Sequence, residues 1–251
     1  DPLWSRGLGD VYKRQLSQLS EIQTQIKDYN ITVGQLTTKI NELTLKIDEM
    51  TGDVVSIGKC GQNVDFVLYS DGRLLLKGTG ATFDYSTDSN PSPLQNNANI
   101  KSVIVSEGVT GIGERLFQYC DNLKTVSLPT TLTAIKKAAF LPHIDGYICH
   151  QSLNGLTELR IPERVAELGV NAFAGTAIKS VTVPSSVVTV GAMVFTECQN
   201  LETVRYSGKI ISDRMFARCI RLKNLTLTKS VREIVGCLLY TSPSPRDQRG
   251  S

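Results

Sequence analysis

The chain has 251 residues and a formal net charge of +3, with 41% hydrophobic and 20% charged residues. These proportions are typical of a folded globular protein and exclude wholesale disorder. No apolar run approaches the roughly 18 residues that a membrane-spanning helix needs, so we expect no membrane span. The small net charge gives no reason to expect a nucleic-acid partner.

The two ends of the chain differ in pattern from everything between them. Residues 1–15 (DPLWSRGLGDVYKRQ) and 237–251 (CLLYTSPSPRDQRGS) share no periodicity with their neighbours. Both resemble translated sequencing-adaptor sequence, so we expect them to be artefactual or disordered and to take no part in the fold. The alternative is a pair of native disordered tails. The protein is then expected to be truncated at both ends, so a signal peptide would not be observable.

A heptad pattern follows the first segment. Apolar residues alternate at spacings of three and four, at Leu19, Ile22, Ile26, Tyr29, Val33, Leu36, Ile40, Leu43, Ile47, Met50, Val54 and Ile57. A period of 3.5 residues keeps a narrow apolar stripe on a partner helix, so residues 16–57 are predicted to form a coiled-coil helix. The seam from Leu19 to Met50 would hold together a homodimer or homotrimer.

One alternative to this coiled coil and one uncertainty about its end remain open. The helix would instead fold back on its own globular domain, where its apolar stripe would also be covered. Gly52 and Gly58 would in addition end the helix between about residues 51 and 58, which would leave Val54 and Ile57 outside it.

Residues 58–99 are expected to form a β-hairpin cap and a loop. Two strand-like runs, 63–69 and 73–77, flank Ser70, Asp71 and Gly72, and such a turn between two β-rich runs is typical of a hairpin. Residues 81–99 are rich in Ser, Asp, Asn and Pro and are predicted to be a loop.

Residues 100–236 form an internal repeat with a period of about 23 residues. About six units begin at Ile100, Leu123, Leu156, Ile178, Leu201 and Leu222. Each unit has a short strand-like L-x-x-L-x-L run and a second apolar pair, and the first five units also have a phenylalanine that we expect on a short helical turn. One unit cannot bury its own apolar face, but stacked units form a continuous core. The predicted fold is an α/β solenoid with a parallel sheet, in which Val126, Leu159, Val181 and Val204 lie in register.

The units resemble leucine-rich repeats of the BspA-like type, whose pattern runs L-x-x-V-x-L-P, then I-G-x-x-A-F, then x-x-C. The resemblance covers residues 100–236, and residues 60–80 are similar to the glycine-punctuated cap that often precedes such arrays. It implies a leucine-rich-repeat solenoid and a surface or secreted binding protein. A coiled coil ahead of the array is similar to phage tail-fibre organisation. The resemblance therefore implies an extracellular location, on a bacterial cell surface or a phage virion.

The chemistry-bearing residues indicate no enzyme, cofactor or metal. Cys120, Cys198 and Cys219 share one repeat position and are predicted to be buried, although a disulfide between the last two remains an alternative. The second unit carries an insertion with the metal-ligand types His143, Asp145, Cys149 and His150. Their spacing matches no known metal site, so a solvated loop is the preferred interpretation.

The remaining functional surface is the outward face of the predicted sheet. Its candidate binding residues are Glu158, Arg160, Thr182 and Arg205, together with Tyr147 in the insertion. We expect a non-enzymatic recognition or adhesion protein that binds a protein or glycan ligand through the repeat face, with avidity supplied by the coiled coil. The alternative is a structural spacer or assembly module of a phage tail fibre or cell-surface fibre, without a ligand of its own.

Overall fold

The computed structural model describes residues 21, 23, 25, 32–40, 53–86, 89–143 and 155–236. The chain divides into two units, Asp1–Lys46 and Ile47–Ser251. In the first unit, residues 32–40 form an α-helix. Three apolar residues at heptad spacing are exposed on it, namely Val33, Leu36 and Ile40, with exposed fractions of 48%, 57% and 61%. The other residues of the predicted seam lie outside the described residues: Leu19, Ile22, Ile26, Tyr29, Leu43, Ile47 and Met50.

The second unit begins with three antiparallel strands, β1 (Val54–Lys59), β2 (Val64–Tyr69) and β3 (Arg73–Gly78). The expectation of a helix over residues 16–57 is wrong at its end, because Val54 and Ile57 lie in β1. Their backbone groups pair with β2, Val54 opposite Tyr69 and Ile57 opposite Val67. A strand paired along its length satisfies the backbone hydrogen bonds that a helix would otherwise satisfy internally.

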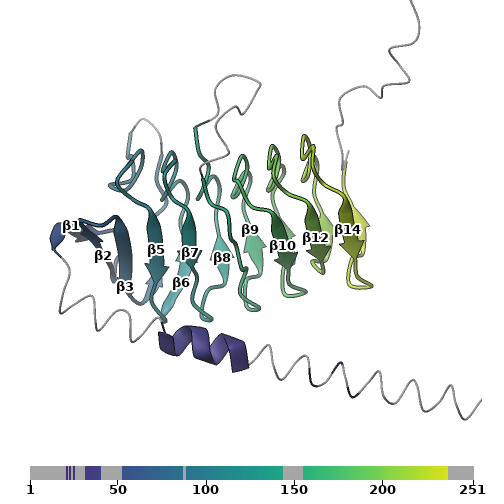
Figure 1. The fold of residues 1–251 in the computed structure, drawn as a ribbon, viewed down its shortest axis with the longest axis horizontal. Helices are drawn as coiled ribbons and strands as arrows, with labels where there is room; N and C mark the ends of the chain where they lie inside the picture. The colour runs from purple at the N-terminus through teal and green to yellow at the C-terminus, as the bar shows by residue number, and fades with distance from the viewer. Residues whose placement is uncertain are drawn as a thin grey trace, which may run out of the picture. The chain divides into compact units, whose positions relative to one another are not determined.

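Strand β3 also pairs in parallel with the first strand of the repeat array. Each repeat forms one rung, and we number the rungs 1 to 6 from residues 100, 123, 156, 178, 201 and 222. The front ladder contains β5 (Ser102–Val105), β7 (Thr125–Ser127), β10 (Ser180–Val183), β12 (Thr203–Tyr206) and β14 (Asn224–Leu227). In rung 3 a parallel bridge from Thr125 to Glu158 takes the place of a strand. Figure 1 shows the rungs side by side from β5 to β14.

A second parallel ladder, the back ladder, contains the later residue of the second apolar pair, such as Ile112 or Leu168. It contains β4 (Gly80–Ala81), β6 (Val109–Ile112), β8 (Ala134–Ile135), β9 (Glu167–Leu168), β11 (Thr189–Val190), β13 (Ile210–Ile211) and β15 (Glu233–Ile234). The predicted parallel register of the front ladder is confirmed where strands pair. Val103 lies opposite Val126, and Val181 lies opposite Val204.

A third ladder replaces the short helical turns that the sequence predicted, so the α/β assignment is wrong and the described repeat array is a mostly β structure. One residue per rung at the same repeat position has a left-handed backbone, with φ between 52° and 59°: Arg115, Ala138, Asn171, Met193 and Arg214. A right-handed helix cannot continue through such a residue. The amides instead bond to the next rung, as where Phe117 N–H donates to Ala139 O at 2.9 Å and Phe173 N–H donates to Val194 O at 3.0 Å.

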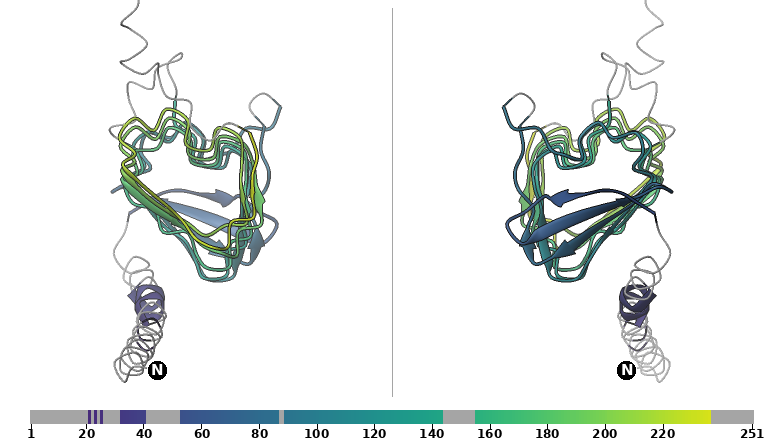
Figure 2. Two further views of the ribbon diagram at one scale, coloured as in Figure 1. Left: turned by 90° about the vertical axis from the view of Figure 1, so that its right-hand side faces the viewer. Right: turned by 90° about the vertical axis from the view of Figure 1, so that its left-hand side faces the viewer.

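The core runs the length of the array, inside the three ladders. Viewed along the array from either end, the rungs superimpose as a roughly three-sided coil (Figure 2). Front-ladder residues that point inward, such as Val103, Val181 and Val204, are buried, as are Ile112 and Leu168 of the back ladder. The rigid sides of this coil place the remaining, outward-pointing side chains at regular intervals.

Candidate binding surface

The outward side chains of the front ladder form two columns, which together we call the outer face. The first column is Ser102, Thr125, Glu158, Ser180, Thr203 and Asn224, and the second is Ile104, Ser127, Arg160, Thr182, Arg205 and Thr226. All are exposed except the half-buried Ser102, Ile104 and Ser127. Because the backbone is bonded to neighbouring rungs, these side chains project from fixed positions.

Four of the five predicted binding residues lie on the outer face. Thr182 and Arg205 are direct neighbours across β10 and β12, and Arg160 occupies the same column one rung earlier. Glu158 is exposed in the other column, beside Thr125. Tyr147 falls in residues 144–154, outside the described residues. The structure therefore gathers four of these residues on one surface.

Sequence reasoning missed a third column at the edge of this face. It contains the residue just before each front strand: Lys101, Lys124, Thr157, Lys179, Glu202 and Lys223. These residues lie in register, because Lys124 N–H donates to Lys101 O at 2.8 Å and Glu202 N–H donates to Lys179 O at 2.8 Å. All four lysines are exposed. The signal in the sequence was a lysine at the second position of four of the six units.

The outer face is an open sheet surface rather than a pocket. The two clearest hollows among the described residues lie elsewhere. One lies in the core against Phe117 and Phe140, and the other lies at the corner of the coil beside Lys136 and Gly169. An open face of this kind suits an extended ligand better than a small molecule, which binds in concave sites.

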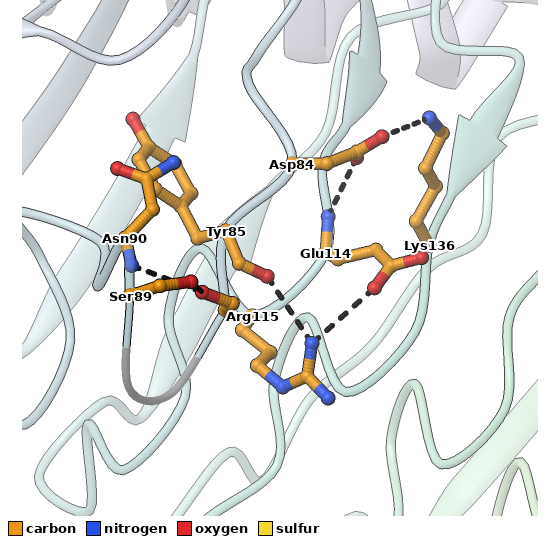
Figure 3. Close-up of polar contacts among 8 residues, drawn as sticks. Asp84, Tyr85, Ser89, Asn90, Glu114, Arg115 and Lys136 are labelled. Carbon is orange, nitrogen blue, oxygen red and sulfur yellow. Dashed lines mark hydrogen bonds and ion pairs between the residues drawn. The ribbon is translucent and has the colours of Figure 1, made fainter.

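A cluster of charged residues at that corner holds the segment before the array against rungs 1 and 2 (Figure 3). Asp84 Oδ2 lies 2.7 Å from Lys136 Nζ, and Asp84 Oδ1 accepts the backbone N–H of Glu114 at 3.0 Å. Arg115 Nη1 donates to Tyr85 O at 3.1 Å. Burial raises the pKa of Asp84, but its hydrogen bonds with Lys136 and Glu114 outweigh burial, so the net pKa lies below its usual value of 3.8. The cluster is a structural clamp.

The thiols of Cys120, Cys198 and Cys219 and the ring of His143 all make polar contacts. Each repeat cysteine donates a hydrogen bond to a carbonyl of the preceding turn, as Cys120 Sγ does to Leu94 O at 3.0 Å. Burial raises the pKa of the Cys120 thiol to about 12, so it carries no thiolate at neutral pH. His143 Nδ1 lies 2.7 Å from Asp121 Oδ2, and the His143 ring stacks on Tyr119.

The expectations of no metal site and no membrane span can be compared with the structure only for the described residues. Among the described residues no group of three or more His, Cys, Asp or Glu side chains is placed to hold a metal ion. Asp145, Cys149 and His150 lie outside those residues. None of the helical segments that the structure describes combines the length and apolarity that a bilayer crossing requires.

Comparison with known proteins finds the same repeat. Residues 92–143 and 141–244 match the model of the BspA type Leucine rich repeat region, in 6 copies. No curated protein matches the chain at a significant level.

Several solved structures are similar to this chain. The Leucine Rich Repeat protein of T. pallidum has 21% identity and a TM-score of 0.50, over 69% of this chain and 84% of that one. A leucine-rich repeat protein from Eubacterium ventriosum has 23% identity and a TM-score of 0.48, over 73% of this chain and 62% of that one. A leucine rich cell surface protein from Faecalibacterium prausnitzii has 16% identity and a TM-score of 0.27, over 74% and 73%. The chain thus spans less than two thirds of the E. ventriosum protein, and the T. pallidum likeness shows the fold alone.

Proposed function

Because the chain belongs to the BspA-type leucine-rich repeat family, we propose that it is a non-enzymatic recognition or adhesion protein whose outer face binds a protein or glycan ligand. The observation that carries this proposal is the outer face itself, two columns of mostly polar and mostly exposed side chains on a parallel ladder. Solenoids use such extended faces for binding. Side chains held by a bonded backbone lose little further freedom when a ligand binds, which favours affinity.

The chemistry of the described residues supports recognition rather than catalysis. The thiols of Cys60 and Cys120 carry no thiolate at neutral pH, because burial raises the pKa of each to about 12. His143 is already bonded to Asp121 and stacked on Tyr119. Arg160 and Arg205 by contrast point their guanidinium groups, each with five N–H donors, toward solvent.

We propose further that the N-terminal helix assembles the chain into a homodimer or homotrimer. The support is the exposed stripe of Val33, Leu36 and Ile40 on the described helix, which a partner helix would cover. Several copies would convert weak single contacts into useful avidity. This arrangement suits attachment outside the cell, on a bacterial surface or a phage virion.

Sedimentation of the full chain tests the assembly. We expect a dimer or trimer at micromolar concentration, and the double variant Leu36→Asp/Ile40→Asp should be a monomer because it buries charge in the seam. A control variant, Lys39→Asp/Gln35→Asp, changes polar positions of the same helix and should stay assembled. A wild-type monomer would contradict the proposal.

Binding is tested on arrays of purified glycans and of extracellular proteins with the fluorescently labelled chain. We expect defined spots for the wild type, and Arg160→Ala/Arg205→Ala should weaken them by about tenfold or more, in line with the cost of losing charged hydrogen bonds. The matched control is Arg164→Ala/Arg232→Ala, which removes two exposed arginines from other parts of the array. Spots that survive the first variant would refute binding through the outer face. Complete absence of spots would favour the alternative function, a spacer or assembly module of a fibre.

A further inference from the structure

We propose that the ligand of the outer face is an acidic polysaccharide, a linear glycan that carries carboxylate or sulfate groups. This inference rests on the proposed function of the outer face and names its ligand class. It is carried by one cation on each of five consecutive rungs, which we call the cation row: Lys101, Lys124, Arg160, Lys179 and Arg205.

The spacing of the cation row follows from the ladder. Adjacent strands of a sheet lie about 4.8 Å apart, so five rungs place the cations along about 19 Å, with the two arginines three residues, or roughly 10 Å, further along the strands than the three lysines. Lys101 and Lys124 are adjacent in register at the strand entrance, and Arg160 and Arg205 flank Thr182 in the second column. A row of this kind selects a linear polymer with anions repeated along it over a single small anion.

The five cations of the cation row outnumber the acids beside them, Glu158 and Glu202. Within the described ranges, no ion pair joins an acidic side chain to any of its five members, whereas Lys223 on rung 6 pairs with Glu202 at 3.7 Å. Across the outer face and the third column, the one other acid is Glu158, two residues before Arg160. Since the net charge of the whole chain is only +3, this excess is a local property of the face. Such a local field attracts a polyanion and concentrates it there.

The side chains around the cation row favour a glycan over a protein or a nucleic acid. Three large exposed apolar residues, Phe83, Val188 and Ile220, lie off the outer face, whose own apolar member Ile104 is half-buried. Protein interfaces depend on apolar or aromatic anchors, and single-stranded nucleic acids stack on aromatic rings. The outer face instead offers hydroxyl groups beside the cations, at Ser180, Thr182 and Thr203. A hydroxyl donates and accepts, which matches the hydroxyls of a sugar, while guanidinium groups bind carboxylate or sulfate in bidentate fashion.

The experiment measures binding of the full chain to four immobilised polymers. Heparin supplies sulfate, polygalacturonate supplies carboxylate, dextran is a neutral glycan, and poly-dT is a nucleic acid. We expect binding to heparin or polygalacturonate that weakens as salt is raised, because bound polyanions release counterions, and no binding to dextran.

The variant Lys124→Gln/Arg160→Gln/Lys179→Gln/Arg205→Gln should lower the affinity by about tenfold or more, as expected when several contacts to a polyanion are lost. The matched control Lys137→Gln/Arg164→Gln/Lys229→Gln/Arg232→Gln removes the same charge from exposed positions elsewhere and should bind nearly as the wild type. Equal unfolding temperatures of both variants would show that folding is intact.

Three outcomes would overturn the inference: equal losses in both variants, tighter binding of poly-dT than of either polyanionic glycan, or no binding of heparin and polygalacturonate. These failures are separable from failure of the proposed function. The arrays can instead identify a neutral glycan or a protein as the ligand, and Arg160→Ala/Arg205→Ala can abolish binding of that ligand. In that case the acidic polysaccharide is rejected, but the outer face remains a binding surface.

Discussion

Phe173 and Phe195 stack on consecutive rungs, with ring centroids 5.7 Å apart and ring planes inclined by 7°. Both side chains are fully buried. The stack continues to Phe140 on one side, at 5.3 Å, and to Phe216 on the other, at 5.8 Å. Phe173 and Phe195 therefore each contact the phenylalanine of the rung before and of the rung after. These contacts couple neighbouring repeats through the core.

Replacing Phe173 with alanine should therefore destabilise the array by about 3–5 kcal/mol, as for other buried phenylalanines. The loss combines the transfer of the ring with a cavity between two neighbouring rings. The exposed Phe83, replaced in the same way, is the control and should cost much less. Urea unfolding followed by circular dichroism measures both values, and similar costs at the two positions would contradict the role of the stack.

For the left-handed residues of the third ladder we predict a substitution that does not lower the stability of the array. Arg214 is exposed and has φ 52°, a conformation that costs an L-residue roughly 1–2 kcal/mol. Arg214→Gly should therefore leave stability unchanged or raise it by up to about 1 kcal/mol, since glycine adopts this conformation freely but loses more entropy on folding. Arg232→Gly, at an exposed position without positive φ, should lower stability. Thermal unfolding compares the two, and a destabilised Arg214→Gly would argue against a strained backbone there.

The clamp between Asp84 and Lys136 predicts that the stability of the array depends on pH in the acid range. The folded pKa of Asp84 lies below its usual value of 3.8, so its contribution is complete above that pH and is lost as the pH falls toward the folded value. The pair is partly exposed, so Asp84→Asn should cost about 1 kcal/mol or less at neutral pH. The difference between wild type and variant should shrink below pH 3.8. Urea midpoints across the acid range measure it, and a difference that stays constant with pH would exclude the carboxylate as its source.

The buried cysteines should resist modification while the chain is folded. Cys60, Cys120, Cys198 and Cys219 are all buried and free of disulfides. The hydrogen bond with Cys198, together with burial, raises the pKa of Cys219. In a Cys149→Ser/Cys237→Ser background, which leaves only these four, labelling by a maleimide near neutral pH should be slow until denaturant is added. Rapid labelling of the folded chain would contradict the packing of the thiols, and the denatured chain is the positive control.

Much of the array was predictable from the sequence because each rung repeats one local pattern. Val126, Val181 and Val204 alternate with polar residues, and side chains two residues apart point to one face of a strand. Burial of that face required neighbouring rungs to stack, which also placed Arg160, Thr182 and Arg205 outward. The helix limit at residue 57 was wrong, because the apolar spacing of Val54 and Ile57 is compatible with a heptad and with a strand. Pairing with β2 decided between them.

The sequence by itself determined the period, the inward-facing residues and the outward position of the predicted binding arginines, since all of these follow from which side chains avoid water. Only the tertiary structure decided how the backbone turns after each back strand and which distant groups meet there. Left-handed φ values at positions such as Arg115 and Met193 arise because amides bond to the next rung, and that partner exists only once the rungs are stacked. The lysine column and the contact between Asp84 and Lys136 have the same origin. Stacking brings together residues that lie far apart along the chain: the repeated lysine is visible in the sequence, but the meeting of Asp84 with Lys136 is not.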